Sequence, residues 1–181
     1  ACSAKSSPWG IAIRSAQRMA IEADPSFYSH SPKGGWKGLE AARAMAMVAY
    51  RTANIYNERQ QDEPDKVDAY RSESYQRYQG KKLRDRFDAR SYYTLTKTMD
   101  THDVGRNRGG VKNALRQIQA ECLIIGIQTD LLFSTAEQEL LANEIPKAQL
   151  HWMDSIHGHD GFLTETKQLT QLLQTFLTQQ S

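Results

Sequence analysis

Apolar residues recur at helical spacing near the start of the chain. Four of them lie three or four positions apart: Trp9, Ile13, Ala16 and Ala20. This period places them on one face of a helix. We expect the helix to end before Pro25, because proline disfavours helical backbone in the residue that precedes it. The following segment, residues 27–35, is rich in serine, proline and glycine and predicts a loop.

Residues 36–110 predict helices and no strand. Apolar residues form three stripes in this charged segment: Leu39, Ala42, Ala46 and Ala49 in the first, Tyr75, Tyr78, Leu83 and Phe87 in the second, and Tyr92, Leu95 and Met99 in the third. The second and third stripes correspond to helices over 72–87 and 91–99. A glycine-containing loop at 107–110 ends this section.

The pattern changes to alternating helices and strands over residues 111–181. A short helix is predicted at 111–120, and the apolar run at 122–127 is typical of a strand buried on both faces. A capping-box motif at 134–137 starts a helix that runs to about Ile145 and that Pro146 stops, and a second strand is predicted at 149–153. The last helix, 164–178, carries five apolar residues that we expect to face inward: Leu169, Leu172, Leu173, Phe176 and Leu177.

This alternation predicts an α/β fold. Strand–helix–strand–helix at this spacing implies parallel strands joined by a right-handed crossover. We therefore divide the chain into a helix and loop at 1–35, a helical section at 36–110, and a βαβα segment at 111–181.

Composition narrows the classes of function. The 181 residues include 23 Lys and Arg against 21 Asp and Glu, and the net charge of +2 gives no electrostatic case for nucleic-acid binding. Cys2 and Cys122 alone cannot form a disulfide framework or a zinc ribbon. No apolar stretch approaches the roughly 18 residues of a membrane span, so no membrane partner is expected. Because the chain starts at Ala1 without a signal-peptide pattern, we expect it to be part of a longer protein.

Residues capable of acid–base chemistry follow both predicted strands. Asp130 comes after the first strand, and His157, His159 and Asp160 come after the second. The carboxyl ends of neighbouring parallel strands meet at one edge, so an Asp and a His can meet there. An Asp bound to a His ring fixes its tautomer and stabilises the imidazolium formed in base catalysis. Asp before His, late in the chain, is the order of α/β-hydrolases, whose nucleophile comes earlier.

Simpler interpretations remain open at this point. Asp130 is compatible with a loop or capping carboxylate, and a His in a glycine-containing loop with a plain surface residue. His157, His159 and Asp160 also suggest a metal site, although no third group of ligands lies nearby in the sequence. The nucleophile is missing, because no Gly-x-Ser-x-Gly motif occurs in the chain. Cys2 and Cys122 are poor substitutes, one at the start of the chain and the other opening a predicted buried strand.

Several sequence blocks resemble one known family. They are Trp9–Ile21 with Asp24-Pro25, Gly38–Arg43, Ala49–Thr52, Glu73–Tyr92, Asp100–Arg106, Gly126–Phe133 and Gly158–Leu163. In combination they resemble the C-terminal half of homoserine O-acetyltransferases, which are α/β-hydrolase-fold enzymes of methionine biosynthesis. The resemblance covers nearly the whole chain. It implies that the rest of the sheet and the nucleophile lie in an N-terminal half that is absent here.

The resemblance also implies roles for residues of this chain. Asp130 matches the acid of a catalytic triad and His159 matches its base. Asp160 matches a residue that holds the amino group of homoserine, and Arg51 an arginine that helps to bind the carboxylate. The section 36–110 matches a helical lid that forms a tunnel to the site and takes part in dimer contacts.

The implied reaction moves acetyl from acetyl-CoA to the hydroxyl of L-homoserine through an acyl-enzyme on a serine outside this chain. The implied partners are these substrates, the N-terminal half and a second copy bound through the lid. Acetyl-CoA is a co-substrate, no cofactor or metal is implied, and the implied location is the cytoplasm. The chain departs from the family pattern at His157, usually Tyr, and at Ser134, usually Pro. We expect the chain alone to be inactive and poorly stable, because an incomplete parallel sheet leaves its edges uncovered.

Three alternatives remain. The first keeps the fold but uses a succinyl donor, or serine or a related alcohol as acceptor. The second is a hydrolase of the same fold. The third is a non-catalytic fragment that associates with other proteins through its helical section.

Overall fold

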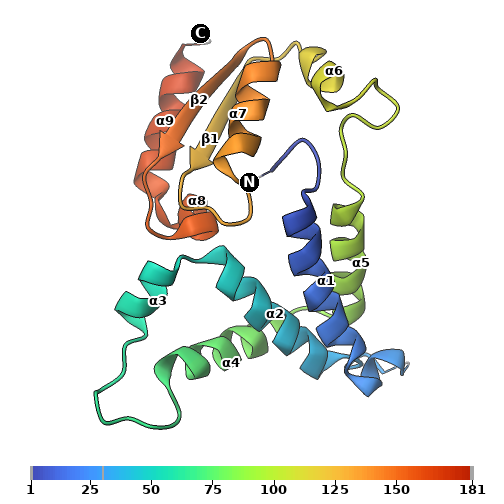
Figure 1. The fold of residues 1–181 in the computed structure, drawn as a ribbon, viewed down its shortest axis with the longest axis vertical. Coiled ribbons are helices and arrows are strands. Elements are labelled where there is room, and N and C mark those ends of the chain that lie inside the picture. Colours follow the sequence, from blue (N-terminus) through green and yellow to red (C-terminus); the bar gives the residue numbers. More distant parts are fainter. Residues whose placement is uncertain (1, 30, 180–181) are drawn as a thin grey trace. The chain divides into compact units, whose positions relative to one another are not determined.

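The structure, a computed structural model, describes residues 2–29 and 31–179. The chain forms two compact units (Figure 1). One comprises Ala1–Lys5, Tyr50–Thr52 and Asp103–Ser181, and contains the sheet. The other comprises Ser6–Ala49 and Ala53–His102 and is helical. The boundaries predicted at residues 35 and 110 stay predictions.

The sheet of the first unit consists of two parallel strands, as the sequence predicts. Strand β1 (Cys122–Ile127) pairs with β2 (Ala148–Met153), with Cys122 opposite Ala148 and Ile127 opposite Met153. Helix α7 (Thr135–Glu144) forms the crossover between them and packs against both strands. Both strands therefore end at the same edge of the sheet, and the loops that follow them are neighbours.

The helices of this unit largely match the prediction. Helix α6 (Val111–Arg116) is shorter than predicted. The last predicted helix, 164–178, corresponds to α9 (Thr166–Thr178), and a separate short helix, α8 (Gly161–Thr164), comes just before it. A 3-10 turn, η2 (Gly158–Asp160), precedes them. At the start of α7, the Glu137 carboxylate accepts the backbone N–H of Ser134, and the Ser134 side chain accepts the backbone N–H of Glu137, as a capping box requires. The core of this unit is a cluster of four apolar residues: Ala4, Leu115, Leu141 and Ile145.

Two expectations about burial in this unit are wrong. Strand β1 is not buried on both faces, since only Gly126 and Ile127 are buried and its other residues are half-buried. The apolar face of α9 is not enclosed either, since none of the helix's described residues is buried and Leu173 and Leu177 are exposed. The physical reason is the small size of the sheet: two strands offer too little surface to cover the apolar residues of β1 and α9.

The helical unit contains α1 (Pro8–Glu22), η1 (Pro25–Tyr28), α2 (Trp36–Tyr50), α3 (Ala53–Arg59), α4 (Arg71–Arg84) and α5 (Ala89–Asp100), with the last residue of α2 counted in the first unit. The sequence patterns did not predict η1 or α3. Leu39 and Ala42 of α2 lie in the core, together with Ile21, Leu83 and Ala89. Helices α1 and α2 approach closely at Gly38, where a Cβ atom would lie 2.5 Å from the Cα of Ile21. Glycine is therefore required at this crossing.

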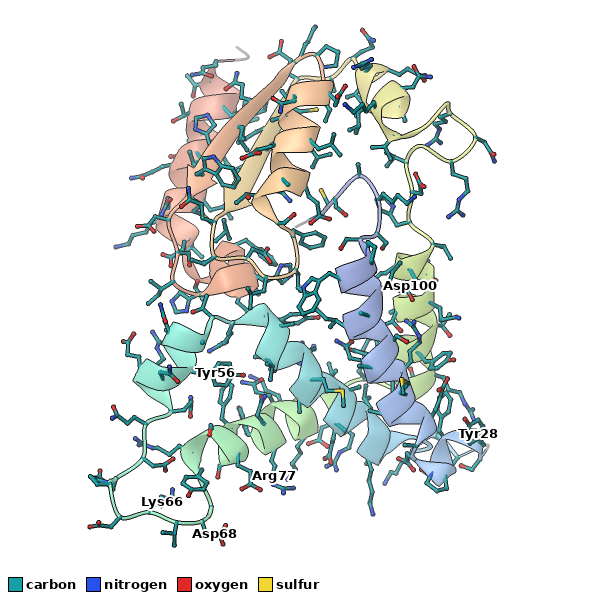
Figure 2. All side chains as sticks on the ribbon, in the orientation of Figure 1. Tyr28, Tyr56, Lys66, Asp68, Arg77 and Asp100 are labelled. Atoms are coloured by element: carbon teal, nitrogen blue, oxygen red, sulfur yellow. The ribbon has the colours of Figure 1, made fainter. Side chains whose placement is uncertain are left out.

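The predicted apolar stripe of α1 is not its buried face. Trp9 is 57% exposed, whereas Gln17 and Arg18 are buried. Asp100 on α5, labelled in Figure 2, binds Arg14 Nε and Arg18 Nη2, each at 2.6 Å. Leu95 and Met99 of the predicted α5 stripe are likewise exposed. Periodicity failed here because paired charges fill part of the contact between α1 and α5, beside the apolar cluster that contains Ile21 and Ala89.

None of the helices in the described residues is both long enough and apolar enough to span a bilayer.

Candidate active site

Asp130 and His159 meet at the carboxyl edge of the sheet. His159 Nδ1 lies 2.9 Å from Asp130 Oδ2, and both side chains are largely buried. Asp130 follows β1 after a turn in which its N–H donates to the carbonyl of Ile127. His159 is carried by η2, in the loop that follows β2. The parallel pairing of the strands thus joins residues that lie 29 positions apart in the chain.

The backbone fixes the Asp130 carboxylate as an acceptor. Its Oδ1 accepts the N–H groups of Leu132 at 2.7 Å and Phe133 at 3.1 Å, and its Oδ2 faces the His159 ring. An ionised carboxylate has no proton to give, so Nδ1 of His159 must be the donor. In the neutral imidazole Nε2 then carries no proton and can accept one from a nucleophile. This is the arrangement that a general base requires.

Three aromatic rings surround the imidazole of His159. The ring centroids of Tyr50, Phe133 and Phe162 lie 5.3, 5.4 and 5.7 Å from that of His159. They come from three parts of the chain: the end of α2, the loop after β1, and α8. Rings packed in this way limit rotation of the imidazole and keep water away from it. The sequence patterns did not predict this role, although each ring lies close to a predicted site residue.

Arg51 and Asp160 form an ion pair next to the Asp130–His159 pair. Arg51 Nε donates to Asp160 Oδ2 at 3.2 Å, and both side chains are mostly shielded from solvent. Arg51 reaches this place because Tyr50–Thr52 belongs to the same compact unit as the sheet. The Thr52 hydroxyl binds this segment to the loop after β2 by donating to the carbonyl of Ile156 at 2.6 Å.

Gly158 allows the loop after β2 to approach the loop after β1 and the segment Tyr50–Thr52. Its φ of +63° lies in the left-handed region, which glycine adopts without strain. A Cβ atom there would lie 3.3 Å from the carbonyl oxygens of Thr129 and Tyr50. A side chain at this position would therefore strain the backbone and press on the segments that carry Asp130 and Arg51.

A cavity of about 280 Å³ opens beside the Asp130–His159 pair. Asp130 and His159 lie on its wall together with Phe133 and Phe162, and residues of β1 and α7 form much of the rest. Cys2 also lines this cavity. The cavity provides space for a reacting group next to the base.

The metal alternative gains no support from the geometry. Within residues 2–29 and 31–179, no three His, Cys, Asp or Glu side chains are grouped so that they could hold a metal ion. His157 Nε2 lies 4.0 Å from Glu165 Oε1. All four residues assigned by resemblance do lie together, as the pairs Asp130–His159 and Arg51–Asp160.

Comparisons with known proteins show which proteins this chain is similar to. No protein-family model matches the chain. The homoserine O-acetyltransferase of Cyclobacterium marinum is 44% identical over 176 residues, which cover 97% of this chain and 50% of that protein. The chain thus spans about half the length of the curated relatives it matches.

Solved structures show the same relationship. The homoserine O-acetyltransferase of Staphylococcus aureus is 28% identical, with a TM-score of 0.74 over 97% of this chain and 48% of that one. Esterase E22, at 19% identity and a TM-score of 0.84 over 97% of this chain and 52% of that one, shares the fold. The predicted α/β-hydrolase fold is confirmed. Over nearly its whole length the chain therefore matches homoserine O-acetyltransferases, and it corresponds to the C-terminal half of these relatives.

Proposed function

We propose that the protein containing this chain transfers acetyl from acetyl-CoA to the hydroxyl of L-homoserine. The observation that carries the proposal is the hydrogen bond between Asp130 and His159, with the Arg51–Asp160 ion pair beside it. The first pair supplies acid–base catalysis, and the second supplies charges of both signs for an amino acid. The names and similarity of the relatives support the same reaction.

The first half-reaction forms an acyl-enzyme. His159 Nε2 takes the proton of a serine hydroxyl supplied by the other half of the protein, and the serine oxygen attacks the thioester carbonyl of acetyl-CoA. Asp130 stabilises the imidazolium that results. The carbon–sulfur bond then breaks, and the imidazolium gives its proton to the departing thiolate. Because that serine lies outside these residues, the chain alone is expected to be inactive.

The second half-reaction uses the same base. His159 takes the proton of the homoserine hydroxyl, whose oxygen attacks the acetyl ester, and the proton returns to the serine as the ester bond breaks. Asp160 would hold the ammonium group of homoserine and Arg51 its carboxylate, since a guanidinium matches a carboxylate in shape and charge.

The remaining features of the proposal concern the whole protein. The helical section 36–110 would act as a lid that excludes water, which favours transfer over hydrolysis. A second copy would bind through this lid, and the enzyme would act in the cytoplasm. Acetyl-CoA would be a co-substrate, with no separate cofactor.

The test compares acyl donors and acceptors on the complete protein. Acetyl-CoA with homoserine should give the highest rate, above succinyl-CoA with homoserine and above acetyl-CoA with serine. Acetyl-CoA alone should be hydrolysed slowly. A higher rate with succinyl-CoA or with serine would show that the proposed donor or acceptor is wrong. Hydrolysis of acetyl-CoA as fast as acetyl transfer would indicate a hydrolase. Failure to form an acyl-enzyme with any donor would reject the proposal.

A further inference from the structure

Ser155 connects the loop that carries Asp130 to the loop that carries His159. Ser155 lies just after β2 and is 6% exposed. Its carbonyl oxygen accepts the hydroxyl proton of Thr129 at 2.7 Å. Thr129 directly precedes Asp130 in the chain. One hydrogen bond thus holds the two loops together beside the Asp130–His159 pair.

The hydroxyl of Ser155 makes two further hydrogen bonds. It accepts the backbone N–H of His157 at 3.1 Å and donates to Glu165 Oε1 at 3.0 Å. Because its proton is directed at the carboxylate, its lone pairs are left for the amide. The bond to His157 fixes the backbone two residues before His159.

Packing leaves Ser155 little freedom to move. A Cβ atom added at Gly161 would lie 2.8 Å from Ser155 Oγ, so α8 begins in direct contact with this side chain. Glu165 is itself held at the end of α8, where its N–H donates to the Gly161 carbonyl at 2.8 Å. The carboxylate that binds Ser155 is therefore part of the same compact turn.

We propose that Ser155 is a positioning residue for the Asp130–His159 pair, with Thr129 and Glu165 as its partners. The Ser155 carbonyl holds Thr129, next to the acid, and the Ser155 hydroxyl holds the backbone of His157, two residues before the base. Hydrogen bonds between acid and base demand placement to within about 0.5 Å, which neighbouring side chains must enforce. The expected effect on rate rests on the proposed function, whereas the expected effect on the His159 tautomer does not.

The test uses the complete protein with its histidines labelled with ¹⁵N. The nitrogen chemical shifts report which ring nitrogen of His159 carries the proton. The wild type should show a single tautomer protonated at Nδ1. Ser155→Ala and Thr129→Val should both give a mixture of tautomers, and kcat for acetyl transfer should fall about 10- to 100-fold with KM for acetyl-CoA nearly unchanged.

Two variants serve as controls. Thr129→Ser keeps the hydroxyl and should restore the single tautomer and the rate. Ser134→Ala removes a serine–glutamate hydrogen bond of the same length, 3.0 Å, at the start of α7. It should leave both readouts unchanged, because Ser134 does not join the two loops.

A single Nδ1 tautomer and a wild-type rate in folded Ser155→Ala would overturn the proposal. If Ser155→Ala does not fold, the same result in Thr129→Val overturns it, since Thr129 is exposed and valine matches its shape. If no variant transfers acetyl and the wild type does not either, the proposed function fails. The tautomer measurement still decides the role of Ser155.

Discussion

Arg51 Nε lies 3.2 Å from Asp160 Oδ2, although 109 positions separate the two residues in the chain. The two side chains expected to bind opposite ends of homoserine thus bind each other. A zwitterionic amino acid can replace this ion pair with two new ones and leave no charge unpaired. A ligand that lacks either charged end would leave one partner without a counter-charge in a partly buried site, which is costly.

Asp160→Ala should weaken homoserine binding more than it slows acyl-enzyme formation. Loss of a hydrogen bond to a charged group costs about 1.5–3 kcal/mol, so KM for homoserine should rise by one to two orders of magnitude. Single-turnover acetylation should change little. Asp154→Ala is the matched control, because this exposed carboxylate lies in the same loop. Equal losses in both half-reactions would contradict the assignment.

Asp130→Asn should abolish most catalysis without unfolding the protein. Its side-chain oxygen can still accept the N–H groups of Leu132 and Phe133, whereas its NH₂ group would face His159 Nδ1. The imidazole must then carry its proton on Nε2, where it cannot act as a base. A loss of kcat on the order of 10⁴-fold is expected. Steady-state kinetics beside circular dichroism would check this, and a loss below about tenfold would show that the pair is not catalytic.

Gly38→Ala should destabilise the helical unit. A Cβ atom there would lie within 3.0 Å of three backbone atoms of Ala20 and Ile21, and backbone cannot move aside as a flexible side chain can. Overpacking of this kind costs about 1–3 kcal/mol or more in the free energy of unfolding. Urea denaturation would measure it. Lys37→Ala, an exposed neighbour, should stay within about 0.5 kcal/mol of the wild type, and equal stability of the two variants would argue against the close crossing of α1 and α2.

The sequence predicted more of the site than of the packing. Asp130 and His159 follow strands, and the parallel pairing of strands dictates that they meet. Arg51 was identified only through the family resemblance, because no local sequence pattern marks it as a site residue. No sequence pattern pointed to Thr129 or Ser155, because a loop serine or threonine whose contacts lie far away in the chain looks in the sequence like any other.

The predictions of burial failed where ion pairs or the small size of the sheet determine which side chains are buried. Helix α1 turns Arg18 inward because Asp100 binds it, and periodicity cannot anticipate a partner that lies 82 positions away. Strand β1 and helix α9 have the composition of buried elements, but the sheet of the described residues has only two strands, of which β1 is one. Their sequences fit the longer proteins that this chain matches over half their length.

Stability of the helical unit should depend on the charge of Asp24. Burial raises the pKa of this carboxyl, but hydrogen bonds from the Ser26 hydroxyl and from the N–H groups of Gly38, Ser26 and Lys37 outweigh it, so the pKa is lowered. A lowered pKa in the folded state means that the stabilisation is full above the ordinary aspartate value of about 3.9. It is lost as pH falls through the lowered pKa.

Asp24→Asn should therefore be less stable than the wild type at neutral pH by about 1–3 kcal/mol, because an amide NH₂ in place of Oδ2 cannot accept the N–H groups of Lys37 and Gly38. The difference should shrink as pH falls below about 3.9. Urea unfolding at several pH values would test this. Glu63→Gln, which changes an exposed carboxylate in the same unit, should match the wild type throughout. A stability difference for Asp24→Asn that does not vary with pH would refute the role of the charge.

The central claim is that Asp130 and His159 activate a serine supplied by the other half of the protein. Intact-mass and peptide mass spectrometry of the complete protein, mixed with acetyl-CoA and no acceptor, tests it most directly. We predict one acetyl ester on a serine outside these 181 residues, formed by the wild type and absent from His159→Gln. An acetyl group on a residue of this chain, such as Cys2 in the cavity beside His159, or an ester that forms equally well without His159, would contradict the account.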